Sequence, residues 1–209
     1  MRRYCEVRAA RIIVAAASVF AGPLSTGALA AASAPQEAAV CVACHGMHGE
    51  GNASGVPRLA GQNADYMSHA LSMFRDGTRA SAIMQPIART LGDAQIRQLA
   101  DYFSGQVAPL ADAASASPHL VLAGKKLAES GSPDAAACFG CHGPQGKGVG
   151  ARFPSIAGQP AQFVMDRLHE FQERARKKAP DPGTMTAVST TLNDQLIEEA
   201  AAYLSQLEP

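Results

Sequence analysis

An internal repeat constrains the fold of this chain more than any other feature of its sequence. The five-residue pattern Cys-x-x-Cys-His occurs twice, at residues 41–45 and at residues 138–142. The 97-residue separation of the two copies also brings the Ala-Gly-Gln triplet at 60–62 onto the same triplet at 157–159. A repeat of this period and extent indicates two homologous domains in tandem.

Each copy of the motif carries the residues that attach a haem. Its two thiols lie close enough to add across the two vinyl groups of one haem, and the adjacent histidine is then placed beneath the iron as a ligand. Three other interpretations are weaker. A zinc site would have to bring both copies together, a thioredoxin-like pair has no use for the histidine, and chance explains two copies poorly. We therefore predict two covalently bound haem c groups, attached through four cysteines and ligated by two histidines (Cys41, Cys44, Cys138 and Cys141; His45 and His142).

The second iron ligand is expected to be a methionine that recurs in both copies. Once a four-residue enlargement in the second copy, at 177–183, is allowed for, Met84 aligns with Met185. Each stands seven residues before a Leu-x-Asp sequence, whereas the other methionines after residue 30 align with residues of other types. A thioether ligand stabilises ferrous iron and raises the reduction potential. We predict Met84 and Met185 as the distal ligands.

The hydrophobic pattern predicts an all-α fold. Helices are expected where apolar residues recur at helical spacing or a helix-ending signal follows, over 35–40, 62–74, 93–104, 120–129, 159–176 and 194–207. No stretch shows the alternation of a strand. A segment rich in Ala, Ser and Pro, residues 111–119, is typical of a linker between a first domain at 31–110 and a second at 120–209. Each unit is small for an unaided core, so a buried haem would supply apolar bulk.

The first 30 residues have the layout of a secretory signal peptide. Four arginines precede or border an uncharged apolar run at 12–21, Gly22 and Pro23 follow, and Ala-Leu-Ala at 28–30 offers a cleavage point. The apolar run is too short to span a bilayer, although an uncleaved anchor is the alternative. We expect export to the periplasm with cleavage near Ala30.

The charge balance excludes one class of partner. The chain has 18 basic and 18 acidic residues, which argues against a nucleic-acid binder acting through a basic surface. Removal of residues 1–30 takes away four arginines and one glutamate and leaves 14 basic and 17 acidic residues, a net charge of −3. A basic run at 174–178 is either a solvated helix end, where cations suit the helix dipole, or a docking patch for an acidic partner.

The motifs together resemble those of the cytochrome c4 family of exported, two-domain cytochromes. The resemblance is carried by CVACHG, GVPRLAGQ, FRDGTR and MQPIARTL in the first copy, and by CFGCHG and FPSIAGQ in the second. It implies two tandem cytochrome c class I domains, each wrapped around one covalently bound haem with histidine and methionine ligands. It also implies that the backbone carbonyls of Pro57 and Pro154 accept hydrogen bonds from the rings of His45 and His142.

Two classes of function are compatible with these features. One is an electron carrier of a respiratory chain, passing electrons from a quinol-oxidising complex to a terminal oxidase. The other is a dihaem subunit of a larger enzyme that oxidises sulfide, thiosulfate or an alcohol. A peroxidase needs an open iron position, which paired methionines argue against. We favour a monomeric, non-enzymatic carrier with redox-protein partners, and the sequence leaves open whether it is free or peripherally bound to the membrane.

Overall fold

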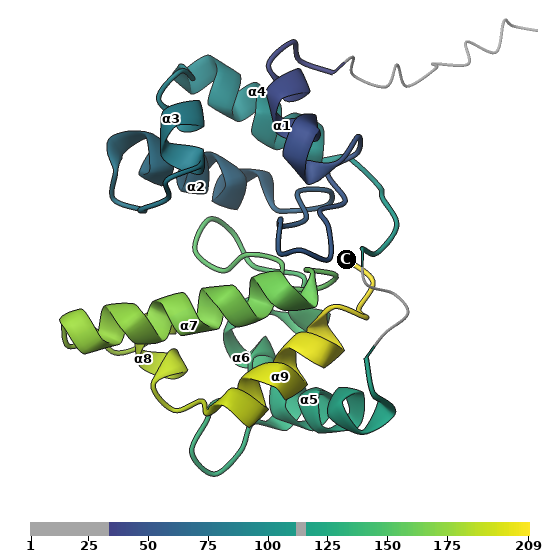
Figure 1. Ribbon diagram of the computed structural model, residues 1–209, viewed down its shortest axis with the longest axis vertical. Helices are drawn as coiled ribbons and strands as arrows, with labels where there is room; N and C mark the ends of the chain where they lie inside the picture. The colour runs from purple at the N-terminus through teal and green to yellow at the C-terminus, as the bar shows by residue number, and fades with distance from the viewer. Residues whose placement is uncertain (1–33, 112–115) are drawn as a thin grey trace, which may run out of the picture. The chain divides into compact units, whose positions relative to one another are not determined.

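Helices and their connecting loops make up the described parts of the chain (Figure 1). The computed structural model describes residues 34–111 and 116–209; the predicted signal peptide and part of the predicted linker lie outside the described residues. Within the described ranges no β-strand forms, and the strand-like contact present is an isolated bridge between Val149 and Phe153. The prediction of an all-α fold is confirmed.

The helices of the first domain enclose a small apolar core. Along α4, Ile96, Leu99 and Phe103 recur at helical spacing and are buried, together with Met67 from α2 and Ala38 from α1. Burying a large apolar side chain stabilises the fold by about 1.5–3 kcal/mol, so this stripe fixes where the helices pack. The helices of this domain are α1 (Ala38–His45), α2 (Ala64–Asp76), α3 (Met84–Ala88) and α4 (Asp93–Ser104).

The opening helix differs from the prediction. A short helix was expected over 35–40, but α1 begins at Ala38 and continues through the haem-attachment motif to His45. No residue in this segment breaks a helix until Gly46, which has a φ of 86° and ends it. The first cysteine motif is therefore helical over its whole length.

The second domain repeats this arrangement with one additional long helix. Its core cluster contains Leu127 of α5, Val164 and Leu168 of α7, and Ile197 and Leu204 of α9. The elements are α5 (Pro118–Ser130), α6 (Phe139–His142), the 3₁₀ turn η1 (Pro144–Gly146), α7 (Ala161–Lys177), α8 (Met185–Ser189) and α9 (Asp194–Leu204).

The first and last helices of the second domain, α5 and α9, cross in direct contact (Figure 1). Gly124 makes this approach possible, because a Cβ atom at that position would lie 1.9 Å from the backbone oxygen of Glu199. Along the chain, α5 directly precedes the loop that leads into the second cysteine motif. Packing of α5 on α9 therefore positions the segment that carries Cys138 and His142.

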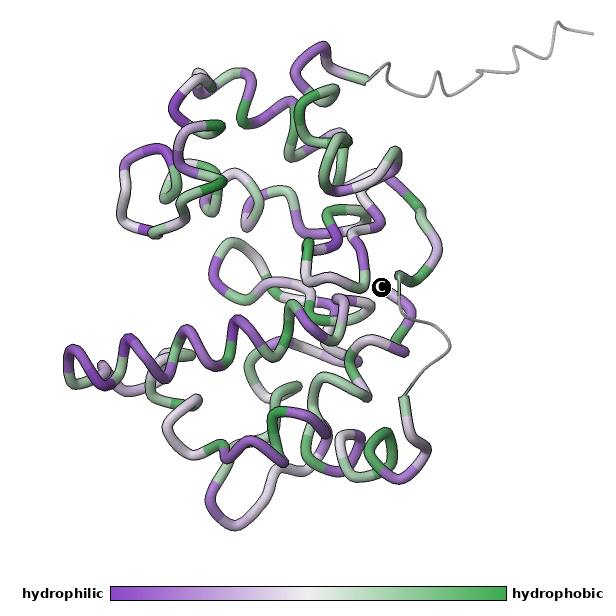
Figure 2. The backbone as a smooth tube through the Cα atoms, viewed as in Figure 1, coloured by the Kyte–Doolittle hydropathy of each residue, from purple (hydrophilic) through white to green (hydrophobic). Residues whose placement is uncertain are grey.

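The described residues, 34–111 and 116–209, cluster as one compact unit. Figure 2 shows that hydrophilic residues prevail over the last turns of α7. None of the helices in the described part of the chain combines the length and the apolar character that crossing a bilayer requires.

Candidate haem sites

Each histidine of the two motifs is buried and held by one backbone carbonyl. The Nδ1 atom of His45 lies 2.8 Å from the oxygen of Pro57, and Nδ1 of His142 lies 2.8 Å from the oxygen of Pro154. Because a carbonyl can only accept, Nδ1 must carry the proton, which leaves the Nε2 lone pair free to bind a metal. The hydrogen bonds implied by the family resemblance are therefore present.

The burial of these rings also sets their protonation. Burial lowers the pKa of His45 and His142, and this effect outweighs the bond to the proline carbonyl, which favours the protonated ring. A neutral imidazole is the form that ligates iron. Both rings are thus in the state that metal binding requires at neutral pH.

Glycines allow the loop between each histidine and its proline to fold tightly on itself. The N–H of Gly51 donates to the oxygen of His45 at 2.8 Å, and Gly148 donates to His142 at 2.7 Å. Both glycines have positive φ, 75° and 84°, and a Cβ at Gly148 would lie 2.5 Å from the nitrogen of Ser155. A residue with a Cβ atom would be strained at a positive φ and would clash with the neighbouring backbone, so glycine is required at both positions. Because each domain has this glycine, the loop has the same geometry in both.

None of the four motif cysteines is in a disulfide, so the thiol of each is available for attachment to a haem. Cys41 and Cys138 are half-buried, and burial raises the pKa of each; Cys44 and Cys141 are exposed. Among the described residues, no group of three or more His, Cys, Asp or Glu side chains comes close enough to hold a metal ion.

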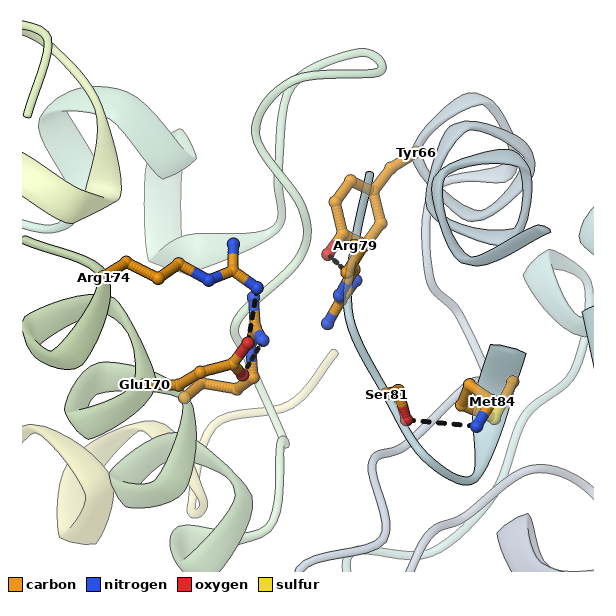
Figure 3. Close-up of polar contacts among 7 residues, drawn as sticks. Tyr66, Arg79, Ser81, Met84, Glu170 and Arg174 are labelled. Carbon is orange, nitrogen blue, oxygen red and sulfur yellow. Dashed lines mark hydrogen bonds and ion pairs between the residues drawn. The ribbon is translucent and has the colours of Figure 1, made fainter. Parts of the chain in front are cut away.

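The two aligned methionines occupy equivalent places, each as the first residue of a short helix. Met84 begins α3, and its N–H donates to the hydroxyl of Ser81 at 3.0 Å (Figure 3). Met185 begins α8, where Thr184 caps the helix by accepting from the N–H of Ala187 at 3.3 Å. Both methionines are partly buried. A side-chain hydroxyl thus fixes the start of each methionine helix.

A partly buried cationic side chain, Arg79, lies near the first methionine loop. The guanidinium of Arg79 stacks over the ring of Phe74, 4.5 Å from its centroid, and Nη1 lies 3.4 Å from the hydroxyl of Tyr66. Its Nε atom is buried and has no hydrogen-bond partner among the described residues. A haem propionate is an anion that such a nitrogen would bind, so this side chain fits the expected cofactor.

The counterpart of Arg79 in the second domain is Arg167. Its guanidinium stacks over Phe171, 4.6 Å from the centroid, and Phe171 is the repeat equivalent of Phe74. Burial lowers the pKa of Arg167, and the nearby charge of Arg79 adds to that effect. Figure 3 shows Arg79 beside Tyr66, with the ion pair of Glu170 and Arg174 on the facing side. Two neighbouring, partly buried cations again favour anionic groups in this region.

Alignment of the repeats alone would pair Arg79 with Arg176, and the structure shows why this is misleading. Helix α7 runs to Lys177, one turn beyond the equivalent end of α2, so the four extra residues of the second copy lengthen the helix. Arg176 is carried outward on that turn, where it is exposed and pairs with Glu173. Repeat alignment does not reveal Arg167, because the aligned residue in the first copy is Ala70.

Comparison with known proteins agrees with this geometry. The cytochrome c family profile matches residues 31–105 and 121–208. A thiosulfate dehydrogenase electron acceptor from Thiomonas intermedia is 36% identical over 98% of this chain and 94% of its own length. Cytochrome c4 from Pseudomonas aeruginosa is 33% identical over 85% of this chain and 88% of its own. The chain belongs to the cytochrome c4 family.

A solved structure supports the same assignment. Reduced recombinant cytochrome c4 from Pseudomonas stutzeri superimposes with a TM-score of 0.73 at 33% identity, covering 82% of this chain and 95% of that one. The protein is accordingly a dihaem electron-transfer cytochrome with two covalently bound haem c groups, one in each cytochrome c domain. Its partners are redox proteins.

Proposed function

We propose that His45 and Met84 ligate the iron of the first haem, and that His142 and Met185 ligate the iron of the second. Cys41 and Cys44 would attach the first haem, and Cys138 and Cys141 the second. The support is the equivalence of the two sites: each has a buried neutral histidine whose Nε2 is free and a methionine at the start of a short helix. A bound haem would supply one-electron chemistry, and these residues would attach it and ligate its iron.

We propose further that the protein is a mobile carrier in a periplasmic respiratory chain, between a quinol-oxidising complex and a terminal oxidase. The observation that supports this proposal is that a buried histidine and a methionine at a helix start recur in both domains. If both residues ligate in each site, neither iron would keep an open position for a substrate. A thioether ligand suits a potential high enough to deliver electrons to an oxidase. Residues 1–30 would direct export, with cleavage near Ala30.

A second candidate function has its own support. The Thiomonas intermedia relative is named as the electron acceptor of a thiosulfate dehydrogenase. By that likeness, this chain would accept electrons from an enzyme that oxidises a small sulfur compound and would remain bound to it. Both candidates use the same two haem sites and differ in what the protein binds stably.

Purification from a mild detergent extract of the native membrane and periplasm separates these candidates. If the dihaem protein elutes alone and is oxidised by oxidase-containing membranes, the result supports the carrier function. If it co-elutes in a fixed ratio with a thiosulfate-oxidising enzyme, the protein is a subunit of that enzyme and the carrier function is wrong. The intact mass of the same sample tests export and cofactor content, since it must lack residues 1–30 and include two haem increments.

The methionine assignment has a spectroscopic test. Replacing Met84 or Met185 by Ala should remove half of the far-red sulfur-to-iron band of the oxidised protein and lower one of the two potentials, because a thioether favours ferrous iron. Met67→Ala is a suitable control: Met67 is a buried core residue of α2 and should leave the band intact. Survival of the full band in either variant would show that its methionine is not a ligand.

A further inference from the structure

Two buried glutamines cross between the domains in a reciprocal manner. Gln62, in the first domain, accepts from the N–H of Ser155 at 2.8 Å and donates to the oxygen of Ser155 at 2.9 Å. Gln159, in the second domain, accepts from the N–H of Arg58 at 3.1 Å and donates to the oxygen of Arg58 at 3.0 Å. Gln62 and Gln159 are equivalent in the repeat, as are Arg58 and Ser155. All four residues are at least nine-tenths buried.

The residues that these glutamines bind are adjacent to the proline carbonyls that hold the histidines. Pro154 and Ser155 share one peptide unit: its oxygen accepts from Nδ1 of His142, and its N–H donates to Oε1 of Gln62. In the other direction, the peptide between Pro57 and Arg58 accepts from His45 and donates to Gln159. Each proximal histidine is thus connected through one peptide group to a glutamine of the opposite domain.

Hydrogen bonds linked through one peptide group strengthen one another. A peptide whose N–H donates to an acceptor carries more negative charge on its oxygen and becomes a stronger acceptor itself. A stronger acceptor at Nδ1 makes the imidazole more basic and a better donor to ferric iron, which lowers the reduction potential. The effect is undiminished by solvent because the glutamines and the rings are buried.

We propose that Gln62 and Gln159 are positioning residues that adjust the potential of the haem in the opposite domain. Gln62 polarises the carbonyl that holds His142, and Gln159 polarises the carbonyl that holds His45. This inference rests on the proposed ligation of iron by the two histidines. Its consequence is that the potentials of the two haems depend on contact between the domains, so that an event that separates the domains raises both.

The test replaces each glutamine by methionine, which has a similar length and forms no comparable hydrogen bond. In holoprotein carrying Gln62→Met, the potential of the C-terminal haem should rise, with a change of about twofold to fivefold in its redox equilibrium constant. The potential of the N-terminal haem should change much less. In Gln159→Met, the potential of the N-terminal haem should rise and that of the C-terminal haem should change much less. NMR-monitored redox titration follows the two haems separately through the resonances of their own ligands.

A second readout reports the hydrogen bonds directly. In the ferrous, diamagnetic protein, the Nδ1–H resonance of His142 should move upfield in Gln62→Met and that of His45 in Gln159→Met, since each bond becomes weaker. Gln162→Met is the matched control: Gln162 is exposed on α7 beside Gly55 of the first domain but does not bind either peptide. It should move neither resonance.

Several outcomes would overturn the proposal. If each glutamine variant shifts both haems alike, the glutamines only hold the domains together; if neither haem shifts, the peptide bonds do not affect the iron. Gln62→Asn and Gln159→Asn, one methylene shorter but still polar, give the same test if a methionine variant fails to fold. The proposed iron ligands are tested separately: if every variant keeps the full far-red band and two covalent haems, the ligand assignment stands even when the glutamine proposal is wrong.

Discussion

Arg79 carries a positive charge into a partly buried position, where its Nε has no partner among the described residues and Arg167 lies near enough to interact. Two cations at such a site repel each other unless an anion lies between them or beside them. Glu170 offsets part of this charge: burial opposes its ionisation, but Arg167 and Arg174 outweigh that effect and lower its pKa. A haem propionate would supply negative charge at this position.

Replacing Arg79 by Gln should lower the potential of the N-terminal haem. A positive charge near a haem disfavours ferric iron, and its removal is expected to change the potential by tens of millivolts, on the order of a Coulomb interaction at an effective dielectric constant of about 20. Spectroelectrochemical titration measures the shift. Arg75→Gln is the control, because Arg75 pairs at 2.7 Å with the exposed Asp93. Equal shifts in the two variants would contradict a specific role for Arg79.

At the scale of the helix, the crossing of α5 and α9 depends on a single small residue. A Cβ atom on Gly124 would lie 1.9 Å from the oxygen of Glu199 and 2.8 Å from the side chain of Tyr203. Backbone atoms cannot move aside as a flexible side chain can, so the two helices would have to separate. Helix α5 leads into the loop before Cys138, so a shift of α5 away from α9 would also displace the second haem-attachment motif.

Gly124→Ala should therefore destabilise the protein although alanine favours helices. Forcing a methyl group into a packed contact costs about 1–3 kcal/mol, which exceeds the gain of about 1 kcal/mol from helix propensity. Denaturant unfolding of the holoprotein, followed by circular dichroism, measures the change. Gly140→Ala is the control, since a Cβ atom added there meets no neighbouring atom of the described residues within 4 Å and the first copy already has Ala43 at this position. A more stable Gly124→Ala variant would show that the helices can separate freely.

The longer helices could be predicted from the sequence because their apolar residues repeat over three or more turns. The prediction for 93–104 matches α4 at both ends, and the prediction for 194–207 has the correct start, with α9 ending at Leu204. Helices α3 and α8 were not predicted, since five residues are too few to show a period. Their positions depend instead on hydroxyl groups such as that of Ser81.

At the scale of the whole molecule, the repeat predicts which residues are equivalent but not which ones touch. It aligns Gln62 with Gln159, and it aligns Arg58 with Ser155. Nothing in that alignment indicates that each glutamine binds the other domain's loop, because a contact between repeats depends on how the domains pack. The candidate ligands are different: attachment chemistry fixes the spacing of Cys, Cys and His within five residues, so a linear pattern is enough to find them.

The charge of the whole molecule also bears on partner binding. The chain after residue 30 has a net charge of −3, yet α7 ends in basic residues. Arg174 and Arg176 are neutralised in ion pairs with Glu170 and Glu173. Lys177 and Lys178 are exposed, and within the described residues no ion pair to either is found. These two lysines are therefore the part of the basic run that is free to attract an acidic partner.

If these lysines guide a partner, Lys177→Gln/Lys178→Gln should slow electron transfer to oxidase-containing membranes by roughly twofold to fivefold at low salt. The difference should disappear at about 0.5 M salt, where the Debye length is only a few ångströms. Stopped-flow oxidation over a range of ionic strengths measures both effects. Lys125→Gln/Lys126→Gln on α5 is the matched control, because it removes the same charge from another exposed site. Equal slowing by the two double variants would indicate net charge alone, and no slowing at any ionic strength would identify the run as a solvated helix end stabilised by the dipole.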